Sequence, residues 1–170
     1  MDEDHLNIRK QNSRLVTIGV IHTPFQQSKG TPIQGSVGEG AEGEVEVYAE
    51  FAEGLADIAG FERLWLIYLL DRVAEPKLIV RPYLDTRERG IFATRAPARP
   101  NPIGITAVRM LGVEGNRLRV AGVDMLDGTP LLDIKPYVPA FDSFANSRAG
   151  WYEGKSAHGV EADDRFEGKN

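Results

Sequence analysis

The sequence has 170 residues, about one domain's length, with 42% hydrophobic and 26% charged side chains, which is typical of a globular fold with its own core. Its 20 basic and 25 acidic side chains give a formal charge of −5, which counts against a general nucleic-acid binder. It has no cysteine, which excludes a disulfide scaffold, a thiolate zinc site and a cysteine nucleophile and permits a reducing cytoplasm. No apolar run reaches the roughly 18 residues of a membrane span, and residues 1–14 lack the apolar core of a signal peptide, so we expect no membrane segment.

Both ends of the sequence have the composition of tails. Residues 1–13 and 153–170 are rich in charged and small polar side chains and contain few large apolar ones. Such segments cannot bury enough apolar area to offset chain entropy. We therefore expect polar, disordered tails at 1–13 and 153–170 on either side of one folded domain at 14–152.

Strand patterns dominate the predicted domain, because runs of alternating or β-branched residues are separated by turn residues. The run 64–70 is continuously apolar, which is typical of a strand buried on both faces. The turn 114–116 contains a glycine and predicts a hairpin. In chain order, the predicted strands are 15–22, 44–48, 64–70, 77–81, 90–94, 103–113, 117–125 and 131–134.

One segment, 49–58, predicts a short helix, because Phe51, Leu55 and Ile58 recur at helical spacing and Gly60 follows as a stop signal. The alternation of strands and long helices that a doubly wound α/β fold needs is absent. The sequence therefore predicts a mainly β fold: a small antiparallel β-barrel with one short helix and loop excursions.

Charge is distributed in blocks along the chain. Residues 39–62 contain eight acidic side chains and no basic one, whereas residues 76–109 contain seven basic side chains against two acidic ones. Six of those seven are arginines, which suit planar, bidentate recognition of anions. The second block is a candidate anion-binding segment within an acidic protein.

Several candidate motifs fail on context. The stretch Gly38–Gly43 matches the dinucleotide pattern G-x-G-x-x-G, but a strand follows it and its glutamates would repel phosphate, so it predicts a flexible loop. The histidines His5, His22 and His158 have no metal-ligand spacing, so no metal is expected. No serine-hydrolase signature appears either.

The stretch 92–104 is the most unusual part of the sequence. It carries Arg95, Arg99 and Asn101 between three prolines that stiffen the chain. Two interpretations stay open: a rigid loop with solvated arginines, or a preorganised site for a charged ligand.

A second unusual stretch spans 123–137. Its centre, 127–130, is a turn by composition. A bare hairpin turn is one interpretation. The other is a site, because polar side chains crowd an apolar strand there, although Asp133 and Lys135 share a strand face and could simply pair with each other.

Four motifs together resemble one family. They are Ile18-Gly-Val-Ile-His-Thr-Pro24, Gly90-Ile-Phe-Ala-Thr-Arg95, Arg99-Pro-Asn-Pro-Ile-Gly104 and Asp127-Gly-Thr-Pro-Leu-Leu-Asp-Ile-Lys-Pro-Tyr137. The sequence resembles the TsaA-like/TrmO family (the YaeB/VirR group) over about 16–139. The resemblance implies a dimeric antiparallel β-barrel that uses S-adenosylmethionine to methylate N6 of threonylcarbamoyladenosine, next to the anticodon of a tRNA.

The resemblance also implies which residues bind the cofactor. Where the family usually reads Pro-Arg-Gln this sequence has Ile33, and where the family has a histidine and a polar residue it has Asp71-Arg72; both departures bear more on the RNA substrate than on the cofactor. The implied cofactor residues are Pro32, Ile33, Gln34, Asp71, Arg72, Arg95, Met125, Asp127, Gly128, Thr129 and Pro130.

The chemistry of methyl transfer suggests roles for these side chains. Arg95 or Arg72 could bind the cofactor carboxylate, and Asp127 its amine or a ribose hydroxyl. N6 of a carbamoylated adenine is a poor nucleophile, so a base would help, and Asp133 and Tyr137 are the candidates. The basic segment 81–99, with Asn101 and Lys135, would bind the tRNA anticodon stem-loop.

Two other functions stay open at this point. The barrel could bind S-adenosylmethionine but methylate another acceptor or act as a ligand sensor, or it could bind nucleic acid without any chemistry. The expectation from the resemblance is a cytoplasmic, homodimeric, metal-independent tRNA methyltransferase.

Overall fold

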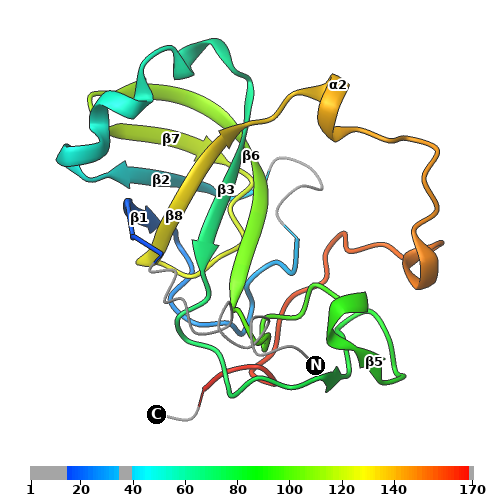
Figure 1. Ribbon diagram of the computed structural model, residues 1–170. Helices are drawn as coiled ribbons and strands as arrows, with labels where there is room; N and C mark the ends of the chain where they lie inside the picture. The colour runs from blue at the N-terminus through cyan, green and yellow to red at the C-terminus, as the bar shows by residue number, and fades with distance from the viewer. Residues whose placement is uncertain (1–14, 35–39, 169–170) are drawn as a thin grey trace, which may run out of the picture.

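Six antiparallel strands close into a barrel in the computed structural model, which describes residues 15–34 and 40–168 (Figure 1). Neighbouring strands follow the order β1-β2-β7-β6-β3-β8. The strands are β1 (Gly19–His22), β2 (Glu42–Val47), β3 (Arg63–Leu69), β6 (Ile103–Glu114), β7 (Arg117–Ala121) and β8 (Thr129–Pro136). The predicted mainly β, antiparallel barrel is confirmed.

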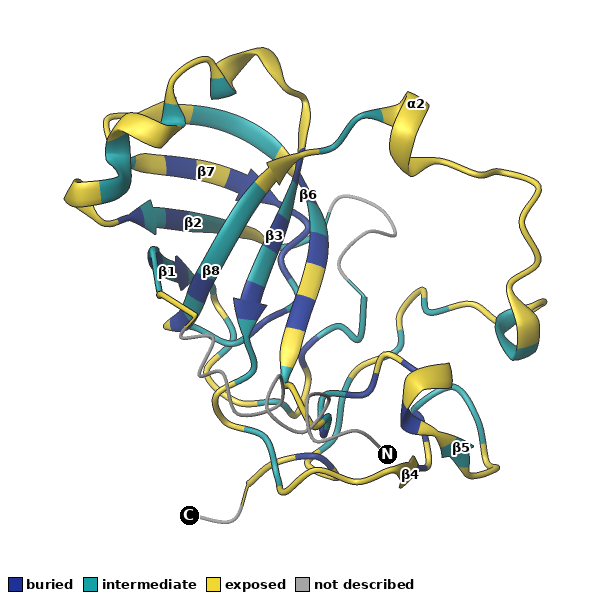
Figure 2. Ribbon diagram, viewed as in Figure 1, coloured by how far each residue is buried: buried dark blue, intermediate teal, exposed yellow. Residues whose placement is uncertain are grey.

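Alternation along each strand builds the core. On β3, Leu64, Leu66 and Tyr68 point into the barrel and are buried, and on β2 Val45 and Val47 do the same. Figure 2 shows this alternation as bands of buried and more exposed residues along the strands. The barrel interior is therefore a packed apolar core, as the period-two pattern requires.

The prediction that 64–70 is buried on both faces is wrong. The outward residues Trp65, Ile67 and Leu69 are only half-buried, and they pair in register with β6, where Ile103 and Ile105 are 39% and 51% exposed. We call these five residues, Trp65, Ile67, Leu69, Ile103 and Ile105, the apolar wall. The strand is apolar on both faces, yet the described chain covers only the inner one.

The predicted helix is present in a tighter form. It is the 3₁₀ helix η1 (Ala49–Leu55), followed by η2 (Ile58–Gly60), and Phe51, Leu55 and Ile58 pack against the barrel core. Between the two segments Asp57 adopts a left-handed conformation with φ 64°. A left-handed residue interrupts helical hydrogen bonding, so a single continuous α-helix does not form.

The predicted strands 77–81 and 90–94 lie outside the barrel. They shrink to β4 (Ile79–Val80) and β5 (Arg89–Gly90), which pair only with each other, and Ile91–Ala93 forms the 3₁₀ helix η3 instead of a strand. We call residues 73–98 the lobe. Its own small core contains Val80, Ile91, Ala96 and Ala98.

The segment 153–168 departs from the prediction of an unpacked tail. Beyond α2 (Pro139–Asp142) and η4 (Gly150–Tyr152), the chain returns along the lobe, and Phe166 is buried in the lobe core with 6% of its surface exposed. Isolated bridges join Pro32 to Glu161 and Val73 to Glu167. We call residues 153–168 the C-terminal strap. One buried aromatic among many polar residues is too weak a compositional signal to reveal the strap.

The predicted tail at 1–13 lies outside the described residues.

Three connections meet at one end of the barrel. They are the described parts of the β1–β2 connection, 23–34 and 40–41, together with 70–102 between β3 and β6 and 122–128 between β7 and β8. Because the strands are antiparallel, these connections share one end, which we call the loop end, whereas η1, η2 and the β6–β7 hairpin lie at the other (Figure 1). Within the described residues no helix has the length and apolarity to cross a bilayer.

Candidate binding site at the loop end

The cofactor residues expected from the resemblance gather at the loop end. Pro32, Ile33 and Gln34 come from the first connection, Asp71, Arg72 and Arg95 from the second, and Met125 to Gly128 from the third, with Thr129 and Pro130 opening β8. Segments up to about 100 residues apart in sequence are thus brought together by barrel closure. These residues were expected from separate short motifs along the sequence. Only the folded barrel brings the motifs together.

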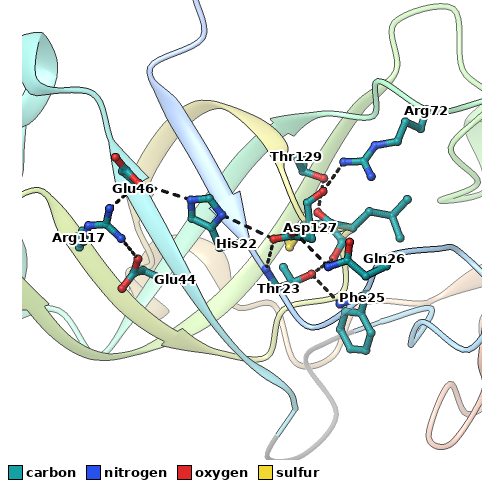
Figure 3. Close-up of polar contacts among 12 residues, drawn as sticks. His22, Thr23, Phe25, Gln26, Glu44, Glu46, Arg72, Arg117, Asp127 and Thr129 are labelled. Atoms are coloured by element: carbon teal, nitrogen blue, oxygen red, sulfur yellow. Dashed lines mark hydrogen bonds and ion pairs between the residues drawn. The ribbon is translucent and has the colours of Figure 1, made fainter.

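Asp127 is the centre of the polar contacts at this end (Figure 3). The Thr23 backbone N–H donates to its Oδ1 at 3.1 Å, and the Gln26 side-chain amide donates to its Oδ2 at 3.2 Å. The Thr23 N–H, with help from Gln26 and the nearby His22, holds the pKa of Asp127 below its usual range. Asp127 is therefore a carboxylate at neutral pH, with about a third of its side chain open to solvent.

The backbone of the same turn is fixed on both sides. The Asp127 N–H donates to the Phe25 carbonyl at 2.7 Å, and the Gly128 N–H donates to the Ile21 carbonyl at 2.9 Å. Gly128 has φ +76°, a conformation that other residues rarely adopt. The predicted turn at 127–130 is confirmed, and it is anchored to the end of β1 rather than being a bare hairpin.

Arg72 reaches this turn from the second connection. Its guanidinium donates to the Asp127 carbonyl, and its Nε lies 3.5 Å from Asp71 Oδ1. A Cβ added to Gly128 would lie 3.6 Å from the Arg72 guanidinium. That distance is ordinary van der Waals contact, so the positive φ at Gly128, and not a lack of space, favours glycine here. The Arg72 guanidinium and the Asp127 carboxylate beside it are groups that could bind a small zwitterionic or polar ligand.

A second pair of predicted residues also meets. Arg95 donates to the Gln34 side-chain oxygen at 2.7 Å, joining the lobe to the first connection. The neighbouring Ile33 N–H donates to the Val160 carbonyl at 3.2 Å, so the C-terminal strap holds this connection in place. The structure thus forms two polar groups at the loop end, Arg72 with Asp127 and Arg95 with Gln34.

Three further predicted cofactor residues, Met125, Thr129 and Pro130, already have contacts within the barrel. Met125 is 3% exposed in the barrel core, and its carbonyl accepts from the Thr23 hydroxyl at 2.9 Å. The Thr129 hydroxyl donates to the Leu126 carbonyl at 2.7 Å, and Pro130 pairs with Val20 on β1. In the described chain, the Met125 side chain belongs to the barrel core, and the Thr129 hydroxyl holds the turn through the Leu126 carbonyl.

The predicted catalytic residues do not meet the loop end of their own chain. Asp133 and Lys135 pair at 2.9 Å on the outside of β8, and the Tyr137 ring lies 5.5 Å from Trp65 beside the apolar wall. At about 3.3 Å per residue, Asp133 lies roughly 13 Å along the strand from Thr129. Asp133 and Lys135 therefore pair with each other, as their positions on one strand face allowed.

Arg99, expected to contact substrate, organises the lobe. Its Nη1 donates to the carbonyls of Ile91 at 3.2 Å and Thr94 at 2.9 Å. Asn101 is exposed, and its carbonyl accepts from the Ile103 N–H at 2.8 Å. The interpretation of 92–104 as a loop with solvated arginines does not hold, because Arg99 is half-buried against backbone carbonyls and Arg95 contacts Gln34.

Sequence reasoning missed several residues of this end. Thr23 and Gln26 hold Asp127, and His22 lies 3.6 Å from its Oδ1 and 3.5 Å from Glu46, which continues into ion pairs with Arg117 (Figure 3). The available signal was the Thr23-Pro24 pair directly after the first strand, because a hydroxyl followed by a proline is typical of a turn.

Among the described residues no group of histidine, cysteine and acidic side chains is arranged to hold a metal ion.

Comparison with known proteins gives one consistent result. Residues 20–143 match the family described as tRNA-methyltransferase O N-terminal domain. The chain is 54% identical over 152 residues to a probable S-adenosyl-L-methionine-binding protein of Pyrococcus abyssi, covering 88% of this chain and 82% of that one. It is 33% identical over 150 residues to the tRNA (adenine(37)-N6)-methyltransferase of Escherichia coli, covering 82% and 64%.

Solved structures agree with this result. The crystal structure of TrmO from Pseudomonas aeruginosa superposes with a TM-score of 0.68 at 36% identity, covering 83% of this chain and 63% of that one. The chain therefore spans somewhat less than two thirds of the length of the TrmO protein in that structure and of the Escherichia coli relative.

Proposed function

The chain belongs to the family of tRNA-methyltransferase O N-terminal domains, and from that premise we propose that it transfers a methyl group from S-adenosylmethionine to N6 of an adenosine in tRNA. The observation that carries the proposal is the meeting of Arg72, Asp127 and Gly128, and of Arg95 and Gln34, at one barrel end. The acceptor that we propose is threonylcarbamoyladenosine next to the anticodon, as the family resemblance implies. The RNA substrate makes the cytoplasm the expected location.

The donor set fits the polar part of the cofactor. S-adenosylmethionine, when bound, supplies an electrophilic methyl group on a positively charged sulfur. The Asp127 carboxylate, held ionised by the Thr23 N–H, suits an ammonium or ribose hydroxyl. The guanidinium groups of Arg72 and Arg95 suit a carboxylate. Pro32, Ile33 and Pro130 supply small apolar surfaces around them.

The basic segment of the lobe supports an RNA substrate. Residues 77–99 carry six basic side chains against two acidic ones. Arg95 already reaches the first connection. Phosphate binding by such a segment depends strongly on salt, because each contact releases counterions. Asn101 and Lys135, which are both exposed, are the further substrate contacts that we propose.

The apolar wall supports a homodimer. Isoleucines at 103 and 105 expose 39% and 51% of their surfaces, next to half-buried Trp65 and Ile67. A continuous apolar strip on a strand pair is a typical self-association surface, and two-fold dimers are the commonest oligomers. Asp133 and Tyr137 border this wall, so either could act as the base only if a second copy brings it to the loop end of its partner.

A second candidate function keeps the cofactor and changes the acceptor. Ile33 replaces the family's arginine, and Asp71-Arg72 replaces its usual pair. Because both differences lie at the loop end, the barrel could methylate another acceptor or act as a sensor of S-adenosylmethionine. Transfer to tRNA separates the two candidate functions, since both bind the cofactor.

Calorimetric titration with S-adenosylmethionine tests the cofactor site. We expect the full chain to bind it, and Asp127→Asn to weaken binding roughly 10-fold or more, because a charge-assisted hydrogen bond is lost. The matched control is Asp57→Asn, which removes a carboxylate at the opposite end and keeps a residue that tolerates positive φ. No heat with the unmodified chain, or equal affinity in Asp127→Asn, contradicts the proposed site.

A further inference from the structure

Phe92 is a large aromatic side chain held in solvent by a rigid support. It lies on η3 with 76% of its surface exposed, whereas its neighbours Ile91 and Thr94 are 1% and 6% exposed. Figure 2 shows this turn as a mostly exposed ribbon on the lobe. Full burial of a phenylalanine is worth roughly 2 kcal/mol. Single exposed apolar side chains are common on protein surfaces, so what distinguishes Phe92 is the hydrogen-bonded backbone around it and the charge of its segment.

The backbone on both sides of Phe92 is fixed by hydrogen bonds. Arg99 donates to the carbonyls of Ile91 and Thr94, and the Thr94 hydroxyl donates to the Ile91 carbonyl at 2.9 Å. The Trp151 indole N–H donates to the Ala93 carbonyl at 2.6 Å. A ring on such a support loses little conformational freedom on binding, so its contact area converts well into affinity.

The surroundings of the ring favour an anionic aromatic partner. The Arg99 guanidinium carbon lies 5.9 Å from the ring centroid. The segment 77–99 has six basic and two acidic side chains, and Asp85, one of the two, is already paired with Arg89 at 2.6 Å. A protein partner for an apolar ring needs no excess of positive charge, whereas single-stranded nucleic acid binds to basic surfaces that carry aromatic rings.

We propose that Phe92 is a stacking platform for an unpaired base of the RNA, with Arg99 behind the ring and the basic segment 77–99 holding the phosphates. The inference rests on the proposed function, because the RNA is its substrate. It assigns to Phe92 the role of holding the loop of the RNA open beside Arg95 and Gln34, which lie in contact at the proposed cofactor site.

Binding of an anticodon stem-loop RNA that carries a fluorescent adenine analogue in its loop tests this role. Base–aromatic stacking is lost in Phe92→Ala, so we expect the dissociation constant to rise roughly 10-fold and the stacking-dependent change in fluorescence to disappear. Phe92→Trp should retain both, and Phe92→Leu, which keeps an apolar side chain, should lose the fluorescence change. The slope of affinity against salt should stay the same in Phe92→Ala, because no phosphate contact is removed.

The matched control is Phe141→Ala, since Phe141 is equally exposed at 74% but lies on α2, outside the basic segment. A dissociation constant for Phe92→Ala within two-fold of the unmodified chain overturns the inference. So does a change in oligomeric state in Phe92→Ala, which would place the ring against a second copy. If the unmodified chain binds no RNA, the proposed function itself fails, and that outcome is distinct from both.

Discussion

At the scale of single residues, the Tyr68 ring that packs over Gly104 leaves no space for a larger residue than glycine at that position. A Cβ on Gly104 would come within 2.1 Å of the Tyr68 ring, which is 6% exposed inside the barrel. The Tyr68 hydroxyl lies 3.0 Å from the Thr106 hydroxyl and donates to Asp124 at 3.4 Å. Burial and the Asp124 charge raise the pKa of Tyr68 above its usual range, so the phenol stays neutral. This glycine lets the ring close the core directly beneath the loop end.

We predict that Gly104→Ala destabilises the protein by about 1–3 kcal/mol, because overpacking forces the Tyr68 ring away from its partners. The melting temperature measures the effect. Gly90→Ala is the matched control, since a Cβ there meets nothing within 4 Å. Equal melting temperatures for the two variants would mean that the ring can move without cost.

Single residues also show where sequence reasoning reached its limit. The turn at 127–130 was predictable because glycine and proline act on their own backbone. Its partners Thr23 and Gln26 lie more than 100 residues away along the chain, and only barrel closure brings them to Asp127. The positions of Asp133 and Tyr137, on the outside of the barrel beside the apolar wall, were unpredictable because they also depend on barrel closure.

At the scale of elements, the C-terminal strap ties the lobe to the first connection. The Tyr83 hydroxyl donates to the Asp163 carbonyl at 3.1 Å, and its ring meets Phe166 edge-on at 5.4 Å. The Ala162 N–H donates to the Thr31 carbonyl at 2.7 Å. Burial, followed by the Asp163 charge, raises the pKa of Tyr83 to about 12. The strap is therefore held by a neutral phenol.

The raised pKa predicts the pH at which the strap loosens. The folded state favours the neutral phenol, so its stabilising contribution is complete below the ordinary value of about 10 and is lost as pH rises through about 12. We expect the stability difference between the unmodified chain and Tyr83→Phe to shrink between pH 10 and 12. Denaturant unfolding at several pH values measures it. A difference that is constant from pH 8 to 12 would contradict the raised pKa of Tyr83.

Strands were predictable where apolar residues alternate or run together over several positions. The strands β2, β3 and β6 lie within about two residues of their predicted bounds, β2 from its alternating pattern and β3 from its continuous apolar run. The lobe strands were overestimated, because prolines, the Arg99 contacts with nearby carbonyls and the long-range contact of Trp151 favour a 3₁₀ turn there. The strap was missed because its only large buried side chain is Phe166.

At the scale of the whole molecule, the barrel separates two surfaces. Its loop end carries the polar site and the basic lobe, and its β3–β6 side carries the apolar wall. The net charge of −5 is uneven along the chain: residues 39–62, largely on β2 and η1, have eight acidic side chains and the C-terminal strap has five more, whereas residues 77–99 have six basic against two acidic ones. The proposed RNA contact therefore depends on the segment 77–99, and its binding should weaken as the salt concentration rises.

The apolar wall makes a prediction about assembly. If a second copy covers it, Ile105→Glu buries an unpaired charge on each side of the interface and should raise the dimer dissociation constant at least roughly 100-fold. Sedimentation velocity measures the change. Leu78→Glu, which adds the same charge at a residue 64% exposed on the lobe, should leave the dimer intact. A monomeric unmodified chain, or an unchanged dimer in Ile105→Glu, would rule out this wall as the interface.

Transfer of a labelled methyl group from S-adenosylmethionine to total tRNA tests the central claim most directly. We predict that the full chain places the label in tRNA, that mass spectrometry of the digested RNA locates it on N6-methylated threonylcarbamoyladenosine, and that Asp127→Asn loses most of the transfer while Asp57→Asn retains it. Cofactor binding by calorimetry with no label in tRNA would contradict the claim and favour another acceptor or a sensor.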